Sequence, residues 1–409
     1  MIQRRIYLEK IAPFIGKPVI KVITGIRRCG KSTFLRMLVE SLIEKGVNQR
    51  NILFINKDSL EFDFIADYKD LVNYVLQKFK SVRGEKYILL DEVQEIAGWE
   101  KAVAGFLADS VADVYITGSN SRMLSSELAT LITGRYVLFT MYPLTFSEFL
   151  LFRKAGKGSD YEKEFDLFMK YGGFPGIHHM EYNDEVVEQY ISSLYSTILL
   201  KDVVARNAIR DISLLERVAH FAADNCGNIT SAKNITDFLK SQGRKGAVDT
   251  VSDYLGMLHS AYLFLKVNRF DIKGKRILEI HEKYYAGDIG LKNVLLGFRK
   301  NDIGGHLENI VFLELLSRGY TVHLGKLNGL EIDFIATKSY ERLYIQVAYL
   351  LHDVKTTARE FGALEKIQDN YPKLVLSMDK FLDSSRNGIG WMNLVEFVNR
   401  EPGAGSREP

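Results

Sequence analysis

The sequence predicts an α/β protein: a parallel sheet with helices first, then a helix-rich segment and two smaller modules. Three observations support this class. The first is that apolar β-branched runs alternate with stretches of helical periodicity across residues 1–145. The second is that several of these apolar runs end in polar residues. Parallel strands bring their carboxyl ends to one edge of a sheet, where ligands bind. The third observation is a glycine-rich stretch, Gly25–Ser32, behind the first apolar run.

The glycine-rich stretch fits the pattern G-x-x-x-x-G-K-[ST] of phosphate-binding loops, between a strand at 19–23 and a helix at 34–40. In this arrangement backbone N–H groups and the helix N-terminus converge on phosphate oxygens. Lys31 is expected to reach the β- and γ-phosphates and assist catalysis, and Ser32 to bind Mg²⁺. The expected nucleotide contacts come from Gly25, Arg28, Cys29, Gly30, Lys31, Ser32 and Thr33. The alternative is a glycine turn that caps an ordinary helix.

An apolar strand at 86–94 carries two adjacent carboxylates, Asp91 and Glu92. The pattern is that of a Walker B strand, in which the aspartate holds Mg²⁺ directly or through water. Glu92 is placed to orient and polarise the attacking water. We expect this strand next to the strand of the phosphate loop. The alternative is a buried strand that ends in a solvated acidic turn.

Further elements complete the expected sheet: strands at 51–56, 113–120 and 135–139, and a helix at 67–79. The strand at 113–120 ends in Ser119 and Asn120. These residues could contact the γ-phosphate or hold the water, or they could cap the next helix, which carries Met123 and Leu128. Arg135 opens the last strand as a candidate charge-neutralising arginine, for its own nucleotide or for a neighbouring subunit. The alternative for Arg135 is an ordinary surface charge.

Several stretches together resemble one group of proteins: Gly25–Ser32, Leu89–Ile96 with Trp99, Thr117–Ser121, Thr133–Arg135, Pro143–Phe149, Tyr171–Pro175, Lys201–Val204 and Asp288–Asn293. The group is the prokaryotic AAA+-superfamily ATPases that carry a C-terminal nuclease-like domain of unknown function, and the resemblance covers nearly the whole chain. It implies an ASCE-type P-loop domain that binds and hydrolyses ATP with Mg²⁺. Such ATPases commonly form rings, so a homo-oligomer is implied as well. The resemblance says much less about what hydrolysis drives.

The middle of the chain reads as a helical lid at 146–210, with a turn at 172–176, and a winged-helix domain at 211–295. The winged-helix order consists of helices at 214–221, 234–239 and 248–259 and a hairpin with strands at 263–267 and 276–280. Basic residues gather at the second-helix loop and the hairpin tip, where such a module can contact DNA phosphates. They are Lys240, Arg244, Lys245, Lys273, Lys275 and Arg276. Winged helices also bind proteins, and the lid could equally be a plain linker.

The last domain, at 296–400, resembles the PD-(D/E)xK nuclease fold. An amphipathic helix is expected at 303–316, with strands at 320–324, 329–336 and 343–348. Glu308 and Asp333 match the first two acidic positions. Gln346 and Ala348 stand where Glu-x-Lys belongs, which removes a Mg²⁺ ligand and the lysine together. Lys355 is a weak substitute for that lysine, so we expect a nuclease-like fold without nuclease activity.

Composition limits the class of protein and the compartment in which it is expected. The 409 residues carry a formal charge of +3 and two cysteines, so we expect a core-forming cytoplasmic protein without disulfides. No apolar run is long enough to span a membrane, and 401–409 is expected to be a disordered tail. We favour a DNA-engaging ATP-hydrolysing motor or switch. The alternatives are a protein-remodelling or signalling NTPase switch, and an ATP-gated nuclease.

Overall fold

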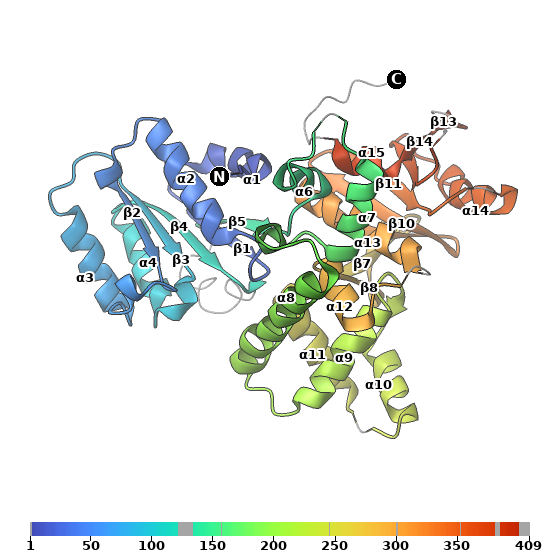
Figure 1. Ribbon diagram of the computed structural model, residues 1–409, viewed down its shortest axis with the longest axis horizontal. Coiled ribbons are helices and arrows are strands. Elements are labelled where there is room, and N and C mark those ends of the chain that lie inside the picture. Colours follow the sequence, from blue (N-terminus) through green and yellow to red (C-terminus); the bar gives the residue numbers. More distant parts are fainter. Residues whose placement is uncertain are drawn as a thin grey trace. The chain divides into compact units, whose positions relative to one another are not determined.

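The computed structural model describes residues 2–121, 134–156, 158–244, 246–299, 302–351, 353–380 and 385–400. The chain divides into two compact units, Met1–Tyr142 and Pro143–Pro409. The first unit ends three residues before the boundary expected at 145. Within the described residues the strands form two sheets, one in each unit (Figure 1). None of the described helices combines the length and the apolar character needed to cross a membrane.

The first unit is built on a parallel sheet. Its strands are β1 (Ile20–Gly25), β2 (Ile52–Asn56), β3 (Tyr87–Asp91), β4 (Asp113–Gly118) and β5 (Tyr136–Met141), in the order β2-β3-β4-β1-β5. The four strand pairings of this sheet are all parallel, as the alternating sequence predicted. β4 lies between β1 and β3, so the expectation that the acidic strand directly neighbours the phosphate-loop strand is wrong. The crossover from β1 to β2 passes the two positions that β3 and β4 later fill, and local sequence does not record this.

Helices cover both faces of this sheet. They are α1 (Arg5–Ile11), α2 (Lys31–Glu44), α3 (Tyr68–Phe79) and α4 (Trp99–Ala108). Val22, Leu90 and Ile116 pack into one hydrophobic cluster with α3 and α4. α2 contacts β1 and β3, and the right-handed crossover from β1 to β2 places it on the opposite face. The helix expected around Met123 lies outside the described residues.

The second unit begins with helices. They are α6 (Phe146–Phe152), α7 (Tyr161–Tyr171), α8 (Asp184–Thr197), the π-helix η7 (Ile198–Ala205), α9 (Ile212–Asp224), α10 (Ala232–Ser241), α11 (Val248–Ser260), α12 (Ile289–Leu296), α13 (Ile303–Ser317), α14 (Val354–Glu365) and α15 (Leu394–Asn399). The segment expected as a lid belongs to this unit, because α7 and α8 pack against α12. The amphipathic character predicted for α13 is wrong. Strands β8–β11 and helices α7 and α12 contact it, so even Glu314 is buried.

A nine-stranded mixed sheet joins the two modules expected at 211–295 and 296–400. Its strands are β6 (Ile229–Thr230), β7 (Phe264–Asp271), β8 (Arg276–Ala286), β9 (Thr321–Leu327), β10 (Leu330–Lys338), β11 (Glu341–Val347), β12 (Lys373–Ser377), β13 (Ser385–Arg386) and β14 (Ile389–Asn393). The order is β13-β14-β12-β11-β10-β9-β7-β8-β6. β7 of the hairpin pairs in parallel with β9. The boundary expected at 295 therefore does not separate two compact units. The elements α9-β6-α10-α11-β7-β8 follow the order expected of a winged helix, with β6 added.

Candidate functional site

The carboxyl edge of the first sheet brings together the two motifs of the first unit. β1 ends at Gly25 and β3 ends at Asp91, and both strands run parallel to β4 between them. Lys31 is the first residue of α2, and Glu92 directly follows β3 in the chain. Lys31 Nζ lies 4.0 Å from Glu92 Oε1. Both side chains are at most 9% exposed. The glycine-rich loop and the acidic pair thus form one buried site.

The loop before α2 depends on its glycines. Gly25 has a φ of +149°, and a Cβ there would stand 2.1 Å from the Met141 carbonyl oxygen at the end of β5. Gly30 is the N-cap of α2 with a φ of +107° and brings no side chain to the first-turn N–H groups. Those N–H groups are therefore available to an anion, as helix N-termini commonly are. The expected contact residues Arg28, in this loop, and Thr33, in the first turn of α2, are exposed.

The side chain of Lys31 is hydrogen-bonded to the backbone of the phosphate loop. Its Nζ donates hydrogen bonds to the carbonyl oxygens of Gly25 and Ile26, at 3.0 Å and 3.2 Å. The side chain is 4% exposed. Cys29, two residues before it, donates its thiol hydrogen to the Met141 carbonyl oxygen at 3.5 Å. Burial raises the pKa of Cys29, so the thiol stays protonated and acts in packing rather than as a nucleophile.

Thr117 connects the two acidic residues and was not among the predicted site residues. Its hydroxyl donates to Asp91 Oδ1 at 2.6 Å, and the Glu92 backbone N–H donates back to it at 2.9 Å. Glu92 has a left-handed φ of +52°, so this contact holds the backbone where the carboxylate leaves the strand. A threonine within an apolar strand is an ordinary strand residue. Only its alignment beside β3 reveals the role.

Asp91 is the residue best suited to a cation. Its Oδ2 is buried and has no hydrogen-bond partner among the described residues. Burial raises the pKa of Asp91; the hydroxyls of Thr117 and Ser32 lower it, the Glu92 charge raises it and the Lys31 ammonium lowers it. An unpartnered buried carboxylate oxygen near a serine hydroxyl suits the hard, oxygen-preferring Mg²⁺. These residues therefore fit the metal that the motif implies.

Two further side chains support the site, and the sequence pattern did not identify them. Gln94, in the turn after β3, donates its amide hydrogen to Glu92 Oε2 and thereby fixes that carboxylate. Arg4, just before α1, is 3% exposed, and its Nη1 donates to the carbonyl oxygens of Cys29 and Tyr142, at 3.1 Å and 2.9 Å. Arg4 therefore braces the loop against the end of β5. Its distance along the chain from both partners leaves no local signal.

The remaining predicted site residues of this unit lie at opposite edges of the sheet. Ser119 and Asn120 follow β4 and are buried at the same carboxyl edge, and their contact with the γ-phosphate or the water stays a prediction. Arg135 is exposed and precedes β5 at the opposite edge, where its carbonyl accepts from the Ile20 N–H at 2.9 Å. From Ile20 to Gly25 the strand runs roughly 16 Å, at about 3.3 Å per residue. A role of Arg135 toward its own phosphate loop is therefore wrong, and a role toward another subunit stays a prediction.

The basic candidates of the second unit are at its surface. Lys240 and Arg244 line an open depression of about 510 Å³ at the end of α10. Lys273, Lys275 and Arg276 are exposed at the tip of the β7–β8 hairpin. Lys245 lies outside the described residues.

The acidic candidates of the second unit lie together, but without the arrangement that a metal needs. The Asp333 N–H on β10 donates to Gln346 Oε1 on β11 at 3.3 Å. Glu308 on α13 instead forms an ion pair with Lys283 on β8, at 3.1 Å. Among the described residues no three His, Cys, Asp or Glu side chains are grouped to hold a metal ion. Lys355 is exposed at the start of α14. The residues present do not fit the Mg²⁺ of a PD-(D/E)xK site.

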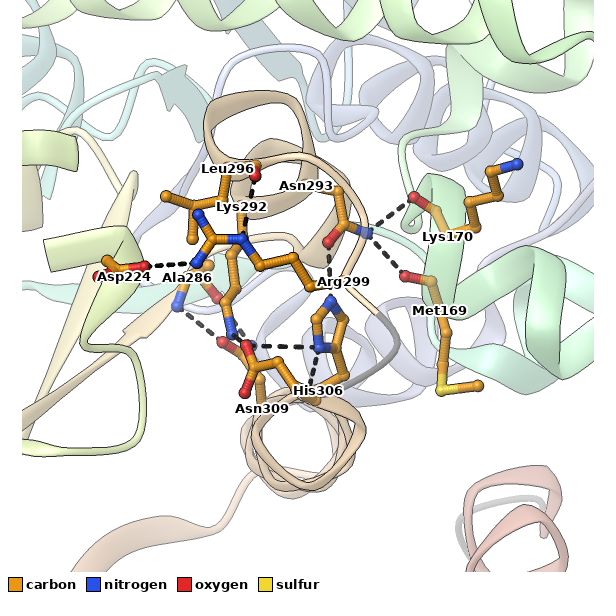
Figure 2. Close-up of polar contacts among 11 residues, drawn as sticks. Met169, Lys170, Asp224, Ala286, Lys292, Asn293, Leu296, Arg299, His306 and Asn309 are labelled. Carbon is orange, nitrogen blue, oxygen red and sulfur yellow. Dashed lines mark hydrogen bonds and ion pairs between the residues drawn. The ribbon is translucent and has the colours of Figure 1, made fainter. Parts of the chain in front are cut away.

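A separate polar junction ties α7 to α12 and α13 (Figure 2). Asn293 on α12 donates to the carbonyl oxygens of Met169 and Lys170, at 2.9 Å and 2.8 Å, and its Oδ1 lies 2.7 Å from His306 Nε2. Asn309 exchanges two hydrogen bonds with the Ala286 backbone, at 2.8 Å and 3.0 Å. This junction is buried and fixes helix α7, which was expected to belong to a lid.

Asp288 extends the same junction to the Gly-Gly turn. Its carboxylate accepts from the N–H groups of Gly173 at 2.7 Å and Gly290 at 2.8 Å. A Cβ on Gly172, whose φ is +78°, would stand 2.1 Å from Asp288 Oδ1. The stretches Tyr171–Pro175 and Asp288–Asn293, which are distant in the sequence, thus pack against each other.

Comparison with known proteins identifies the family. A family model for an AAA domain matches residues 17–150, and one for a domain of unknown function (DUF8612) matches residues 162–302. An uncharacterized protein of Haemophilus influenzae is 37% identical over 399 residues, covering 97% of this chain and 98% of the relative. The chain belongs to the P-loop AAA+ ATPases. An uncharacterized protein of Methanocaldococcus jannaschii is 33% identical over 359 residues, covering 85% of this AAA+ chain and 78% of the relative.

A solved structure is also similar to this AAA+ protein. The Walker-type ATPase of Pyrococcus abyssi has a TM-score of 0.48 and 15% identity, covering 72% of this chain and 96% of that chain. The match to the domain of unknown function runs across the boundary expected at 210 and ends at the start of α13. Helices α7 and α8 of the expected lid and the elements expected as a winged helix are therefore part of one matched region, whereas α6 lies outside it.

Proposed function

We propose that this AAA+ protein binds Mg·ATP at the carboxyl edge of its first sheet and hydrolyses it to ADP and phosphate. One observation carries the proposal. The phosphate-loop lysine, Lys31, and the acidic pair of Asp91 and Glu92 meet at that edge, with Lys31 Nζ 4.0 Å from Glu92 and Asp91 Oδ2 without a partner among the described residues. Family membership supports nucleotide binding, and the geometry supports turnover.

Each residue has a separate task in this mechanism. The backbone N–H groups of Gly30–Thr33 bind phosphate oxygens, and Lys31 exchanges its loop carbonyl partners for the β- and γ-phosphates. Ser32 and Asp91 would hold Mg²⁺, which supplies positive charge to the β- and γ-phosphate oxygens when bound. Glu92 orients the attacking water and accepts its proton. Catalysis of phosphoryl transfer is mostly positioning and electrostatic stabilisation, so the hydrogen bonds that fix Glu92 matter to the rate.

Two substitutions test this assignment. Lys31→Ala is expected to remove binding of a fluorescent ATP analogue. Glu92→Gln is expected to keep binding while phosphate release falls by roughly 10²- to 10⁴-fold, the usual contribution of a general base. Lys45→Ala and Glu95→Gln are matched controls, because both residues are exposed near the same elements. Turnover of Glu92→Gln at the wild-type rate would refute the assignment of the base.

We further propose that hydrolysis is coupled to DNA bound by the second unit. The exposed residues Lys240, Arg244, Lys273, Lys275 and Arg276 support contacts with phosphates. Each such contact contributes about 0.9 to the slope of log affinity against log salt concentration. Replacing both Lys273 and Lys275 by alanine should therefore reduce the slope by about 1.8. An unchanged slope would remove this interface.

One observation favours a protein partner instead. The exposed face of α11, the helix that reads DNA in many winged helices, carries Asp249 and Asp253. Carboxylates at that place repel phosphates and suit a basic protein surface. Measuring ATP hydrolysis with and without single-stranded, double-stranded and branched DNA separates the two candidates. Stimulation by DNA supports the first, and hydrolysis indifferent to every DNA supports the protein-remodelling switch.

A further inference from the structure

The cluster around Glu308 contains a buried ammonium group. Lys283 comes from β8, and its side chain is 6% exposed. Its Nζ lies 3.1 Å from Glu308 Oε1 on α13 and 2.5 Å from Glu331 Oε1 on β10. One lysine thus links three segments that are distant in sequence. A buried charge persists only when it is paired, and here two carboxylates pair it.

The charge of Lys283 is secure at neutral pH. Burial alone would lower the pKa of Lys283, but the carboxylates of Glu308, Asp333 and Glu331 outweigh burial and raise it. Burial and the Glu308 charge raise the pKa of Asp333, while Lys283 and the Val347 N–H act against them. The ammonium is therefore the permanent positive charge among these acidic side chains.

One oxygen atom of each of Glu308, Asp333 and Gln346 already accepts a hydrogen bond within the cluster. Glu308 Oε1 accepts from Lys283 and from the Tyr285 hydroxyl. Asp333 Oδ2 accepts from the Val347 N–H at 2.8 Å, and Gln346 Oε1 accepts from the Asp333 N–H at 3.3 Å. Mg²⁺ needs near-octahedral oxygen ligands at about 2.1 Å. An ion bound to Glu308 Oε1 would stand at most roughly 5 Å from the ammonium and be repelled by it.

We propose that the Lys283 ammonium is the resident cation of this carboxylate cluster and takes over the neutralising role that a divalent metal has in the PD-(D/E)xK nucleases, which the sequence of this domain resembles. The cluster then differs from the PD-(D/E)xK motif in two ways: Glu-x-Lys is missing, and a lysine from another strand is present. The lysine has not been lost from the cluster, because β8 supplies one from a different strand. The second unit gains a metal-independent tie between β8, α13 and β10, and it loses metal-dependent hydrolysis.

The test is to remove the ammonium and ask whether a divalent ion enters. Mn²⁺ is titrated into the full-length chain by isothermal titration calorimetry. The parent carries Asp91→Asn, so that the carboxylate of the ATPase site does not contribute. Lys283→Gln keeps hydrogen-bonding capacity without charge and should bind Mn²⁺ at least about tenfold more tightly than the parent. Adding Asp333→Asn should abolish that gain, and Lys283→Arg, which keeps the charge, should behave like the parent.

Two results would overturn the proposal. The first is Mn²⁺ binding by the parent that disappears with Asp333→Asn, because an ion would then already share the cluster. The second is a Lys283→Gln variant that is folded by circular dichroism and gains no Asp333-dependent binding. Should Lys283→Gln not fold, the parent and its Asp333→Asn variant still decide the matter. Identical titrations support the resident ammonium, and a lost signal refutes it.

Discussion

Replacing Thr117 by valine tests the junction on which the proposed ATPase site depends. Valine keeps the branched shape of threonine and replaces the hydroxyl with a methyl group, which cannot hydrogen-bond. Thr117 is fully buried, and its hydroxyl connects Asp91 Oδ1 at 2.6 Å with the Glu92 N–H at 2.9 Å. Without it, a buried carboxylate oxygen and a buried backbone N–H lose their partner at the same time.

The expected effect follows from those two groups. Leaving a buried polar group unsatisfied costs about 1–3 kcal/mol, so the loss of both partners should lower the unfolding free energy of the first unit by roughly 2–6 kcal/mol. Glu92 would also lose the contact that holds its left-handed backbone at φ +52°. Small displacements of a catalytic group reduce rates strongly, and ATP turnover should fall on the order of 10²-fold.

The assay must report on the first unit alone. The chain has two tryptophans, and Trp99 on α4 is 5% exposed in the core of that unit. In a Trp391→Phe background, urea unfolding followed by tryptophan fluorescence reports Trp99. Thr117→Ser keeps the hydroxyl and serves as the matched control. A valine variant within about 0.5 kcal/mol of wild type, with normal turnover, would refute the reasoning.

Three further predictions use other contacts. Arg4→Met should weaken binding of an ATP analogue and lower the unfolding free energy of the first unit by about 1–3 kcal/mol, because the Cys29 carbonyl loses its buried donor; unchanged binding would contradict this. Gly25→Ala should abolish analogue binding, since its Cβ would stand 2.1 Å from the Met141 carbonyl oxygen, and a variant that binds normally would show that the loop adapts. Burial raises the pKa of Asp288 to about 6, whereas the unfolded value is about 3.9. The stability from this raised pKa is therefore fully present below about pH 4 and lost as pH rises through 6. In denaturant unfolding, the unfolding free energy of wild type minus that of Asp288→Asn should fall by up to about 3 kcal/mol between pH 4 and 7, and a difference that stays constant with pH would disprove this.

Where the sequence was informative, contacts are local. The loop of Gly25–Ser32 uses residues that are neighbours in the chain, so its pattern alone predicts a phosphate site. The parallel sheet follows from apolar runs that alternate with helices, and Asp91 was found because it ends such a run. The helices and strands that the sequence placed between 214 and 348 overlap observed elements, whereas α12, α14, α15, β6 and β12–β14 were not predicted individually.

Where sequence reasoning failed, strand neighbours and direction decide the outcome. β4 separates β1 from β3, so Thr117 stands beside Asp91 without any motif to announce it. Arg135 was placed near the phosphates although the direction of β5 puts it at the other edge. α13 was expected to be amphipathic, yet it is enclosed by α7, α12 and β8, which precede it in the chain, and by β9–β11, which follow it.

The sequence by itself determined the class of this protein, because a P-loop and a Walker B strand are encoded by short, contiguous patterns. Tertiary structure alone decided which side chains support them. Arg4 reaches the loop across 25 residues, and Lys283 reaches Glu308 across the same separation. Such contacts depend on how sheets and helices come together, and burial then makes each one costly to lose.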